Sequence, residues 1–389
     1  MDPTTGPAAP RPLPVQRALF DIPNDVAYFN CASLAPQLRS AREAAEAAWR
    51  RRAQPWLIRA DDWFTEAEER RALFARLAGV DVDGVALVPA TSYGLAVAAA
   101  NLTAAPGQRV LVLAEDYPSN YYTWQRFARR TGATLVAVAR SGGQSWAEAL
   151  LEALDERTAV VAVLAVHWTD GALVDLDAVA ARARAVGAAV VVDASQALGA
   201  MPLDLAAVRP DFLVSVGYKW LLGPFALGYL YVAPQHRDGV PLEENWISRL
   251  GSQDFARLVD DQDRYQPGAR RFDVGQRTHF ETTPMAIAAL RQLLEWEVPR
   301  VAATLRRTTG RIEEQVRGLG LGLTSSDRGP HLLGIRLPAP ARQRVAAALT
   351  RAGVFAGVRG SSLRVSPHLW TTEEDVGRLL AALAAALDG

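Results

Sequence analysis

The stretch Asp211-Phe-Leu-Val-Ser-Val-Gly-Tyr-Lys-Trp-Leu-Leu-Gly-Pro224 joins a continuous apolar run to the only lysine of the chain. Further apolar runs of similar length occupy residues 85–89, 109–114, 134–139, 159–166, 188–193 and 227–232. Such runs are typical of strands that a parallel sheet buries on both faces, and helical patterns separate several of them. The last runs follow one another closely, which indicates antiparallel connections there. The sequence therefore predicts an α/β fold, with a mostly parallel sheet of about seven strands flanked by helices.

The pattern changes near residue 284. A long helical pattern covers residues 285–318, and shorter strand and helix patterns then alternate at 331–337, 341–352, 362–366 and 372–387. We expect a smaller α+β domain over residues 284–389.

The large domain is expected to cover residues 28–283, with 28–77 bridging to the small domain. Residues 1–27 contain several prolines and lack both the basic and the apolar segment of a signal peptide. This segment is predicted to be a disordered or loosely packed leader.

Composition excludes several classes of partner and compartment. The formal net charge is zero, with 42 basic and 42 acidic residues, so neither a nucleic acid nor an anionic membrane is an expected partner. No apolar run approaches the roughly 18 residues of a membrane helix. The chain has a single cysteine, Cys31, so no internal disulfide can form. The lack of internal disulfides favours a cytoplasmic location.

Lysine is almost absent from the chain, which contains Lys219 and 41 arginines. Arginine would serve a surface or an ion pair equally well. A partly buried amine can lose its proton and attack a carbonyl carbon, whereas a guanidinium stays protonated. The lone lysine therefore suggests Schiff-base chemistry; the alternative is that one lysine escaped a compositional drift by chance.

Polar residues follow several predicted strands, where ligands bind in open α/β sheets. Thr91 and Ser92 begin a helical pattern after the run at 85–89, so they hold a phosphate or act only as N-cap residues. Tyr117 follows the run at 109–114, and it either stacks on a flat heteroaromatic ring or closes the core.

Asp193 ends an apolar run, where a carboxylate is costly without a cationic or hydrogen-bonding partner. A pyridinium nitrogen would be such a partner, and the carboxylate would keep the ring protonated as an electron sink. The alternative is an N-cap for the residues that follow. Together with the lysine and the phosphate candidates, Asp193 points to pyridoxal phosphate.

Two motifs carry a definite family resemblance. Val191-Val-Asp-Ala-Ser-Gln-Ala197 and Gly217-Tyr-Lys-Trp-Leu-Leu-Gly-Pro224 resemble the signature of the class V aminotransferases. These fold-type I pyridoxal-phosphate enzymes include cysteine desulfurases, kynureninase and isopenicillin N epimerase. The similarity extends from about Tyr28 to the final helix, and it implies pyridoxal 5′-phosphate as the cofactor.

The resemblance also implies a role for each matching residue. Lys219 would form the internal aldimine and then move the Cα proton. Asp193 would pair with the pyridine nitrogen, and Gln196 with the phenolic oxygen. Tyr117 would stack on the ring, where the family has His or Phe. His167 falls where relatives have Asn or another polar residue near the ring oxygen. The implied phosphate ligands are Thr91, Ser92 and Tyr218.

Substrate and partner contacts follow from three further matches. Arg364 matches the family's arginine for the substrate α-carboxylate, and its two parallel hydrogen bonds would orient the Cα–H bond. The alternative is an ordinary surface arginine. Asn30 lies in a segment that resembles the N-terminal lining of the substrate pocket. Gln276 lies in a stretch resembling the loop that reaches the neighbouring subunit's phosphate, although Thr is common there. A homodimer with active sites at the subunit interface is implied.

Transamination of an α-amino acid is the reaction we expect. Elimination by a C–S or β-lyase, or epimerisation, is the alternative with the same cofactor. A cysteine desulfurase needs a thiol near the small-domain arginine, yet Cys31 lies at the other end of the chain and residues 324–364 contain none.

Other protein classes fit the sequence less well. A non-catalytic binding protein that kept the fold would be expected to have lost one of Lys219, Asp193, Gln196 or Arg364. A nicotinamide-dependent enzyme would need a glycine fingerprint after its first strand. The five histidines show no HExxH spacing and there is no second cysteine, so no metal site is expected.

Overall fold

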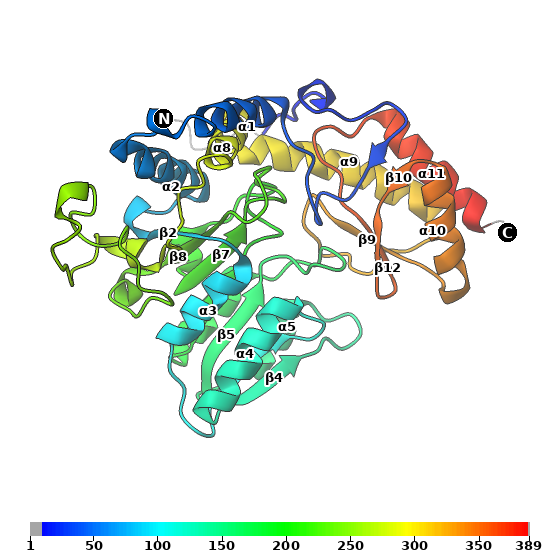
Figure 1. Ribbon diagram of the computed structural model, residues 1–389. Helices are drawn as coiled ribbons and strands as arrows, with labels where there is room; N and C mark the ends of the chain where they lie inside the picture. Colours follow the sequence, from blue (N-terminus) through cyan, green and yellow to red (C-terminus); the bar gives the residue numbers. More distant parts are fainter. Residues whose placement is uncertain (1–9, 388–389) are drawn as a thin grey trace, which may run out of the picture.

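The computed structural model describes residues 10–387, and its centre is a seven-stranded sheet (Figure 1). The strand order is β2-β8-β7-β6-β5-β3-β4. The strands are β2 (Val85–Val88), β3 (Arg109–Leu113), β4 (Thr134–Val138), β5 (Thr158–Leu164), β6 (Ala189–Asp193), β7 (Phe212–Val216) and β8 (Gly228–Val232). Strands β3 to β7 run parallel, whereas β8 is antiparallel to both of its neighbours. The predicted α/β class, the seven apolar runs and the antiparallel end are confirmed.

Eleven α-helices complete the part of the chain that the structure describes. They are α1 (Arg39–Arg52), α2 (Thr65–Ala78), α3 (Thr91–Asn101), α4 (Pro118–Thr131), α5 (Trp146–Ala153), α6 (Leu176–Ala185), α7 (Leu205–Val208), α8 (Thr283–Trp296), α9 (Val298–Gly318), α10 (Arg342–Arg351) and α11 (Glu373–Leu387). Short 3-10 helices are η1 (Arg17–Leu19), η2 (Pro55–Leu57), η3 (Ala60–Trp63), η4 (Val82–Gly84), η5 (Pro234–His236), η6 (Phe255–Arg257), η7 (Gly268–Phe272) and η8 (Ala339–Ala341).

Alternate residues of each central strand enter two separate cores. In β6, Val191 packs with residues of α3 and α4 on one face. Its neighbours Val190 and Val192 pack with residues of α2, α5, α6 and α8 on the other. All three side chains are at most 1% exposed, and burial of such a side chain contributes roughly 1.5–3 kcal/mol. A sheet covered on both faces leaves its carboxyl edge as the open place for a ligand.

The C-terminal part forms a smaller unit around its own core. Its antiparallel sheet has the order β11-β12-β9, formed by β9 (Leu333–Arg336), β11 (Gly357–Arg359) and β12 (Ser362–Val365). A second, two-stranded sheet pairs β1 (Ala27–Tyr28) with β10 (Val354–Phe355) in parallel. The N-terminal strand therefore completes the C-terminal unit, beside α10 and α11 (Figure 1).

Residues 10–27 differ from the loosely packed leader expected of them, while residues 1–9 of that leader lie outside the described residues. Leu13 is buried, and its backbone N–H donates to Thr304 Oγ1 over 2.7 Å. Phe20 is 1% exposed and meets the Trp370 ring edge-on at 5.0 Å between centroids. Two large apolar side chains in the segment thus anchor it, despite its prolines.

The helical pattern predicted over residues 285–318 is two helices rather than one. Glu297 separates α8 from α9 with a φ of 62°. Pro299 has no N–H to donate to the carbonyl four residues earlier, so a continuous helix would be interrupted there.

No helix within residues 10–387 has the length and apolar character needed to cross a membrane.

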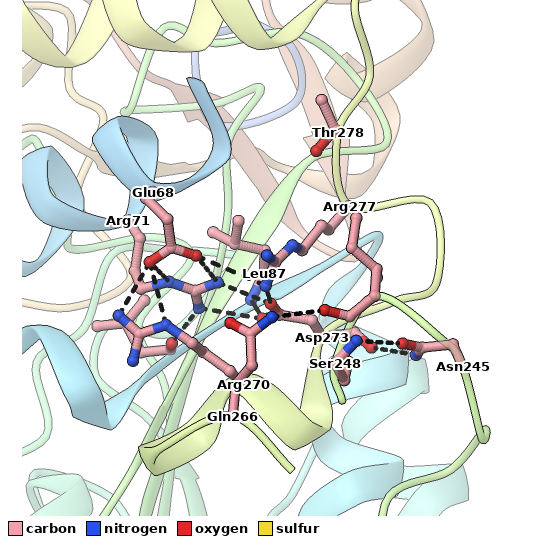
Figure 2. A network of polar contacts seen from close by, with 12 residues as sticks. Glu68, Arg71, Leu87, Asn245, Ser248, Gln266, Arg270, Asp273, Arg277 and Thr278 are labelled. Atoms are coloured by element: carbon pink, nitrogen blue, oxygen red, sulfur yellow. Dashed lines mark hydrogen bonds and ion pairs between the residues drawn. The ribbon is translucent and has the colours of Figure 1, made fainter. Parts of the chain in front are cut away.

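Strand β2 is an edge strand, and a buried ion network closes its free side (Figure 2). Asp273 accepts the backbone N–H of Leu87 at 2.7 Å, while the Val274 N–H donates to the Leu87 carbonyl at 3.0 Å. Asp273 is paired with Arg71 at 2.7 Å and with Arg277 at 2.5 Å, and all three side chains are fully buried. The network satisfies edge groups that would otherwise attract another strand.

Candidate active site

A cavity of about 330 Å³ lies at the carboxyl edge of the central sheet. Strands β3 and β5 are neighbours there although β4 lies between them in the sequence, which is the crossover point where α/β sheets bind ligands. Seven residues predicted from sequence line the cavity, namely Thr91, Ser92, Tyr117, Asp193, Gln196, Tyr218 and Lys219. The topology therefore brings together side chains that are up to 128 positions apart in the chain.

Lys219 lies in a closed loop between β7 and β8. The Gly217 N–H donates to the Leu227 carbonyl, and the Gly223 N–H donates to the Gly217 carbonyl, both at 2.8 Å. Gly199, at a φ of 90°, lies against the same loop, where a Cβ would come within 2.3 Å of the Trp220 carbonyl oxygen. Only glycine permits both that φ and that approach.

The Lys219 amine is held in an apolar and aromatic environment. Its side chain is largely buried, and Nζ lies 5.4 Å from the Tyr117 ring centroid and 5.8 Å from that of Tyr218. Burial lowers the pKa of Lys219 from 10.5 to about 8, against the opposing effect of Asp193. A nucleophilic, unprotonated amine is therefore accessible close to neutral pH.

Asp193 ends β6 and lies on the strand adjacent to the one that leads to Lys219. One carboxylate oxygen accepts the Ser195 N–H at 2.8 Å. Burial raises the pKa of Asp193, while Ser195 and the charge of Lys219 oppose the shift. A cationic ligand group in the cavity would give this carboxylate the partner that burial demands.

The N-terminus of α3 faces the same cavity. Thr91 and Ser92 form its first turn, and no side chain caps the helix there. Thr91 Oγ1 lies 3.1 Å from Ser195 Oγ. Free N–H groups, hydroxyls and the positive end of the helix dipole make this a site for an anion.

Aromatic rings form one wall of the cavity. Tyr117 meets Trp168 edge-on at 5.6 Å, and the Trp168 indole N–H donates to the Glu115 carbonyl at 2.9 Å. Next to Tyr117, Asp116 accepts the side-chain N–H of Asn120 at 2.8 Å. Burial raises the pKa of Asp116 to about 7, although Asn120 and the Tyr117 backbone N–H lower it. A flat ring could stack on the wall that this network supports.

Strained backbone is concentrated near the site. Among the described residues, five that are not glycine have a positive φ, and three of them flank the cavity: Glu115 at 56°, Leu222 at 54° and Ala226 at 63°. Such conformations persist where the surrounding fold over-determines them, which is common around ligand sites.

A second cavity, of about 260 Å³, adjoins the first and shares Lys219 and Tyr117 with it. Arg364 of β12 lines it, is 2% exposed, and donates to the Trp168 carbonyl at 2.9 Å. Asn30 does not line the cavity, but its Oδ1 accepts from Arg364 at 3.3 Å. The C-terminal unit thus presents a guanidinium to the space beside the lysine.

His167 and Gln276 do not belong to the lining of either cavity. The His167 ring is buried, stacks on Trp146 at 5.1 Å, and lies 2.9 Å from Thr169 Oγ1. Its neighbour Trp168 faces the cavity instead. Gln276 is exposed at the surface of this subunit, while the adjacent Arg277 is buried against Asp273.

Several lining residues were not expected from sequence, among them Ser119, Ser195, Phe225 and Arg359. Ser195 lies between Asp193 and Gln196 in the motif Val191–Ala197, so its position in the sequence could have indicated that it lines the site. Arg359 gave no signal because it is one of 41 arginines, and only the pairing of β11 with β12 brings it to the site.

Comparisons with known proteins show the family and the fold of this chain. A family model described as Aminotransferase class-V matches residues 59–379. The chain is 28% identical to a kynureninase of Deinococcus radiodurans, over 97% of this chain and 94% of that protein. It is 27% identical to an isopenicillin N epimerase of Streptomyces clavuligerus, over 82% and 83% respectively. An apo cysteine desulfurase from Thermococcus onnurineus NA1 has the same fold, with a TM-score of 0.84 at 19% identity, covering 97% of this chain and all of that one.

Proposed function

This chain belongs to the class V aminotransferase family of pyridoxal-phosphate enzymes, and we propose that it transaminates an α-amino acid. The cofactor, pyridoxal 5′-phosphate, carries a phosphate, a ring nitrogen, a phenolic oxygen and an aldehyde. The larger cavity has a chemically matched partner for each of these groups, so the residues present fit the cofactor.

The proposed assignments follow the chemistry of each side chain. The phosphate would lie at the start of α3, with Thr91, Ser92 and Tyr218 as ligands. Asp193 would hold the proton of the ring nitrogen, which relieves the cost of its burial. Gln196 Oε1 accepts from Trp220 and its Nε2 donates to the Ala32 carbonyl, which leaves one N–H for the phenolic oxygen.

When bound, pyridoxal phosphate draws electrons from the substrate Cα and accepts the substrate amino group. Lys219 would take the proton from Cα, since its amine has a pKa of about 8 and is the only amine among the lining residues. Arg364 would bind the substrate α-carboxylate and so fix the Cα–H bond relative to the cofactor plane.

Transamination is favoured over epimerisation by the number of proton-transferring groups that each reaction needs. It needs a proton to leave Cα and return to another carbon on the same face, which one amine can do. Epimerisation needs a second proton donor on the opposite face of the substrate Cα. The His167 imidazole adjoins Trp168 in sequence, but it stacks on Trp146 and lines neither cavity. The usual desulfurase reaction needs a reactive thiol, whereas Cys31 is fully buried and burial raises its pKa.

The observation that carries the proposal is the position of Lys219 in a cavity that Asp193 and the start of α3 also line. To test it, the purified holoenzyme is incubated with L-amino acids and no keto acid. We expect the cofactor to convert from its aldehyde to its amine form, with one equivalent of keto acid. Continuous release of keto acid with ammonia, or appearance of the D-amino acid with no spectral conversion, would contradict transamination.

The proposal includes a homodimer in the cytoplasm. Large apolar side chains are exposed on this subunit, among them Phe225 (70%), Trp56 (75%) and Val259 (87%). Phe225 lines both cavities, so the same contact that covers it would close the active site. Light scattering on the purified protein should give twice the chain mass; a monomer would contradict the assembly. The single cysteine supports a cytoplasmic location.

A further inference from the structure

The second cavity carries positive charge with no acidic side chain in its lining. Lys219, Arg359 and Arg364 all line it. Its other lining residues are Ala32, Ser33, Leu34, Tyr117, Trp168, Gln196, Tyr218 and Phe225, none of them acidic. If Arg364 binds the α-carboxylate, Arg359 is left as a second guanidinium without an assigned role.

The β11–β12 hairpin places both guanidinium groups on the same face. Arg364 is paired across the ladder with Gly357, and Arg359 lies two residues beyond Gly357 on the same strand. Side chains two positions apart, and side chains directly opposite, share one face of a sheet. Gly360, at a φ of 56°, allows the tight turn that follows Arg359. The turn thus fixes Arg359 beside Arg364.

Gly357 also leaves space for this arrangement. A Cβ at that position would come within 3.1 Å of Arg359 Nη1, which is tighter than an ordinary contact. The Arg359 guanidinium therefore lies over the Gly357 backbone, where Nη1 donates to the Val358 carbonyl at 2.8 Å.

Within residues 10–387, neither guanidinium has a carboxylate within ion-pair distance. Arg364 donates to one backbone carbonyl and to the amide oxygen of Asn30, and its Nε is buried without a partner. Burial, together with the charge of Arg359, lowers the pKa of Arg364 to about 10. Two adjacent like charges that lack a counter-ion make the cavity a strong site for a doubly anionic ligand.

We propose that Arg359 binds a second anionic group on the substrate, so that the enzyme selects α-amino acids with a negatively charged side chain. This inference rests on the proposed function and specifies its substrate class. Arg364 would bind the α-carboxylate, and Arg359 the side-chain anion. The aromatic walls from Tyr117, Trp168 and Phe225 would lower the local dielectric and strengthen both pairs.

The first test compares isosteric substrates with the unaltered holoenzyme. L-Aspartate and L-glutamate are each compared with their amides, L-asparagine and L-glutamine. A charge-assisted hydrogen bond is expected to favour one of the acids over its amide by about 10- to 100-fold in kcat/KM. If neither acid exceeds its amide, the proposal fails, and no altered protein is needed to learn this.

The second test assigns the preference to Arg359. Arg359→Gln should reduce kcat/KM for the preferred acid much more than for its amide, so that the ratio of the two values falls toward one. Arg364→Gln should weaken acid and amide alike, because both carry the α-carboxylate. Arg336→Gln is a matched control: this arginine is exposed on β9 of the same sheet and lines neither cavity. Equal losses for acid and amide in Arg359→Gln would overturn the assignment.

Binding without turnover gives an independent readout. Calorimetry on the holoenzyme should show tighter binding of succinate or glutarate than of its monoamide, and Arg359→Gln should remove the difference. A wrong substrate class and a wrong reaction give different experimental results. An enzyme that transaminates neutral amino acids and ignores dicarboxylates refutes only the role of Arg359. A protein that binds no pyridoxal phosphate refutes the proposed function itself.

Discussion

Lys219 and Asp193 lie at the same edge of the sheet because β6 and β7 are parallel neighbours, with Asp193 paired to Val214 in register. Asp193 is the last residue of β6, and Lys219 comes three residues after the end of β7. The carboxylate favours the protonated amine, while burial disfavours it more strongly. The relationship sets the pH at which the amine becomes reactive.

The first prediction concerns the rate at which the cofactor-free protein attaches pyridoxal phosphate covalently. The rate should rise with pH to a midpoint near 8, well below the 10.5 of an ordinary lysine, because Lys219 reacts only when unprotonated. The absorbance of the attached cofactor measures this rate. The same reaction with a lysine-containing peptide shows how much of the pH dependence comes from titration of the cofactor itself. Asp193→Asn should move the midpoint further down, since it removes the charge that supports the protonated amine. A midpoint above 10 would refute the burial effect.

Stability of the cofactor-free protein should follow the same titration. The unfolded chain binds a proton on Lys219 between about pH 8 and 10.5 and the folded chain does not, so the free energy of unfolding rises with pH in that window. Denaturant unfolding of Lys219→Met should lack this rise. Charged and titratable groups that act on the amine are Asp193, Arg364, Cys31 and Arg359.

A third prediction tests the ion network in Figure 2. Asp273→Asn leaves Arg71 and Arg277 without the fully buried carboxylate that they share, with only the partly exposed Glu68 near both, and we expect a loss of about 3–5 kcal/mol in urea unfolding. Asp260→Asn, which breaks an exposed pair with Arg257, should change stability by about 0.5 kcal/mol or less.

The same ion network makes the stability of the folded protein sensitive to acid. Burial alone would raise the pKa of Asp273, but Arg71 and Arg277 hold it below its usual 3.8. Its contribution to stability is present above that pH and is lost as the pH falls below it. An Asp273→Asn variant as stable as the unaltered protein would show that the network does not secure the edge of β2.

The fourth prediction concerns the anion site at the start of α3. Thr91→Val removes the Oγ1 that lies 3.1 Å from Ser195 Oγ. Because a hydrogen bond to a charged group is lost, the Kd for pyridoxal phosphate should rise about tenfold in a fluorescence titration. Thr131→Val, at the far end of α4, is the matched control and should bind normally. Equal affinity in both variants would place the phosphate elsewhere.

Tyr117 gives a fifth prediction. Tyr117→Phe keeps the ring and should retain cofactor affinity, whereas Tyr117→Ala should weaken it about tenfold through loss of stacking. Tyr122→Ala, on the helix α4 that begins directly after Tyr117, is the control; this side chain is 63% exposed, and its loss should have no effect. Loss of affinity in the phenylalanine variant would mean that the hydroxyl acts, and not the ring.

The local sequence pattern predicts those features of the molecule that depend on residues close together in the chain. The strands were visible as apolar runs such as 188–193, and Lys219 stood out because arginine replaces lysine everywhere else. The break between α8 and α9 at Glu297 was not predicted, because the helical spacing of apolar residues continues across it. Pro299 did indicate a helix interruption at this point.

Features set by distant contacts were not predictable. Phe20 packs on Trp370, 350 residues later in the chain, so the packed N-terminal segment could not be inferred from its prolines. Arg359 reaches the site only through hairpin register. The family resemblance implies a position near the ring oxygen for His167, but the structure has Trp168 in the cavity lining and His167 stacked on Trp146. Whether Gln276 reaches a neighbouring subunit stays a prediction.

The most direct measurement is peptide mapping by mass spectrometry after borohydride reduction of the holoenzyme. The account predicts one cofactor adduct per chain, on the peptide that contains Lys219, and no adduct at that position in Lys219→Arg, although charge and length are kept. An adduct confined to the N-terminal amine, or an unaltered visible absorbance band in Lys219→Arg, would contradict it.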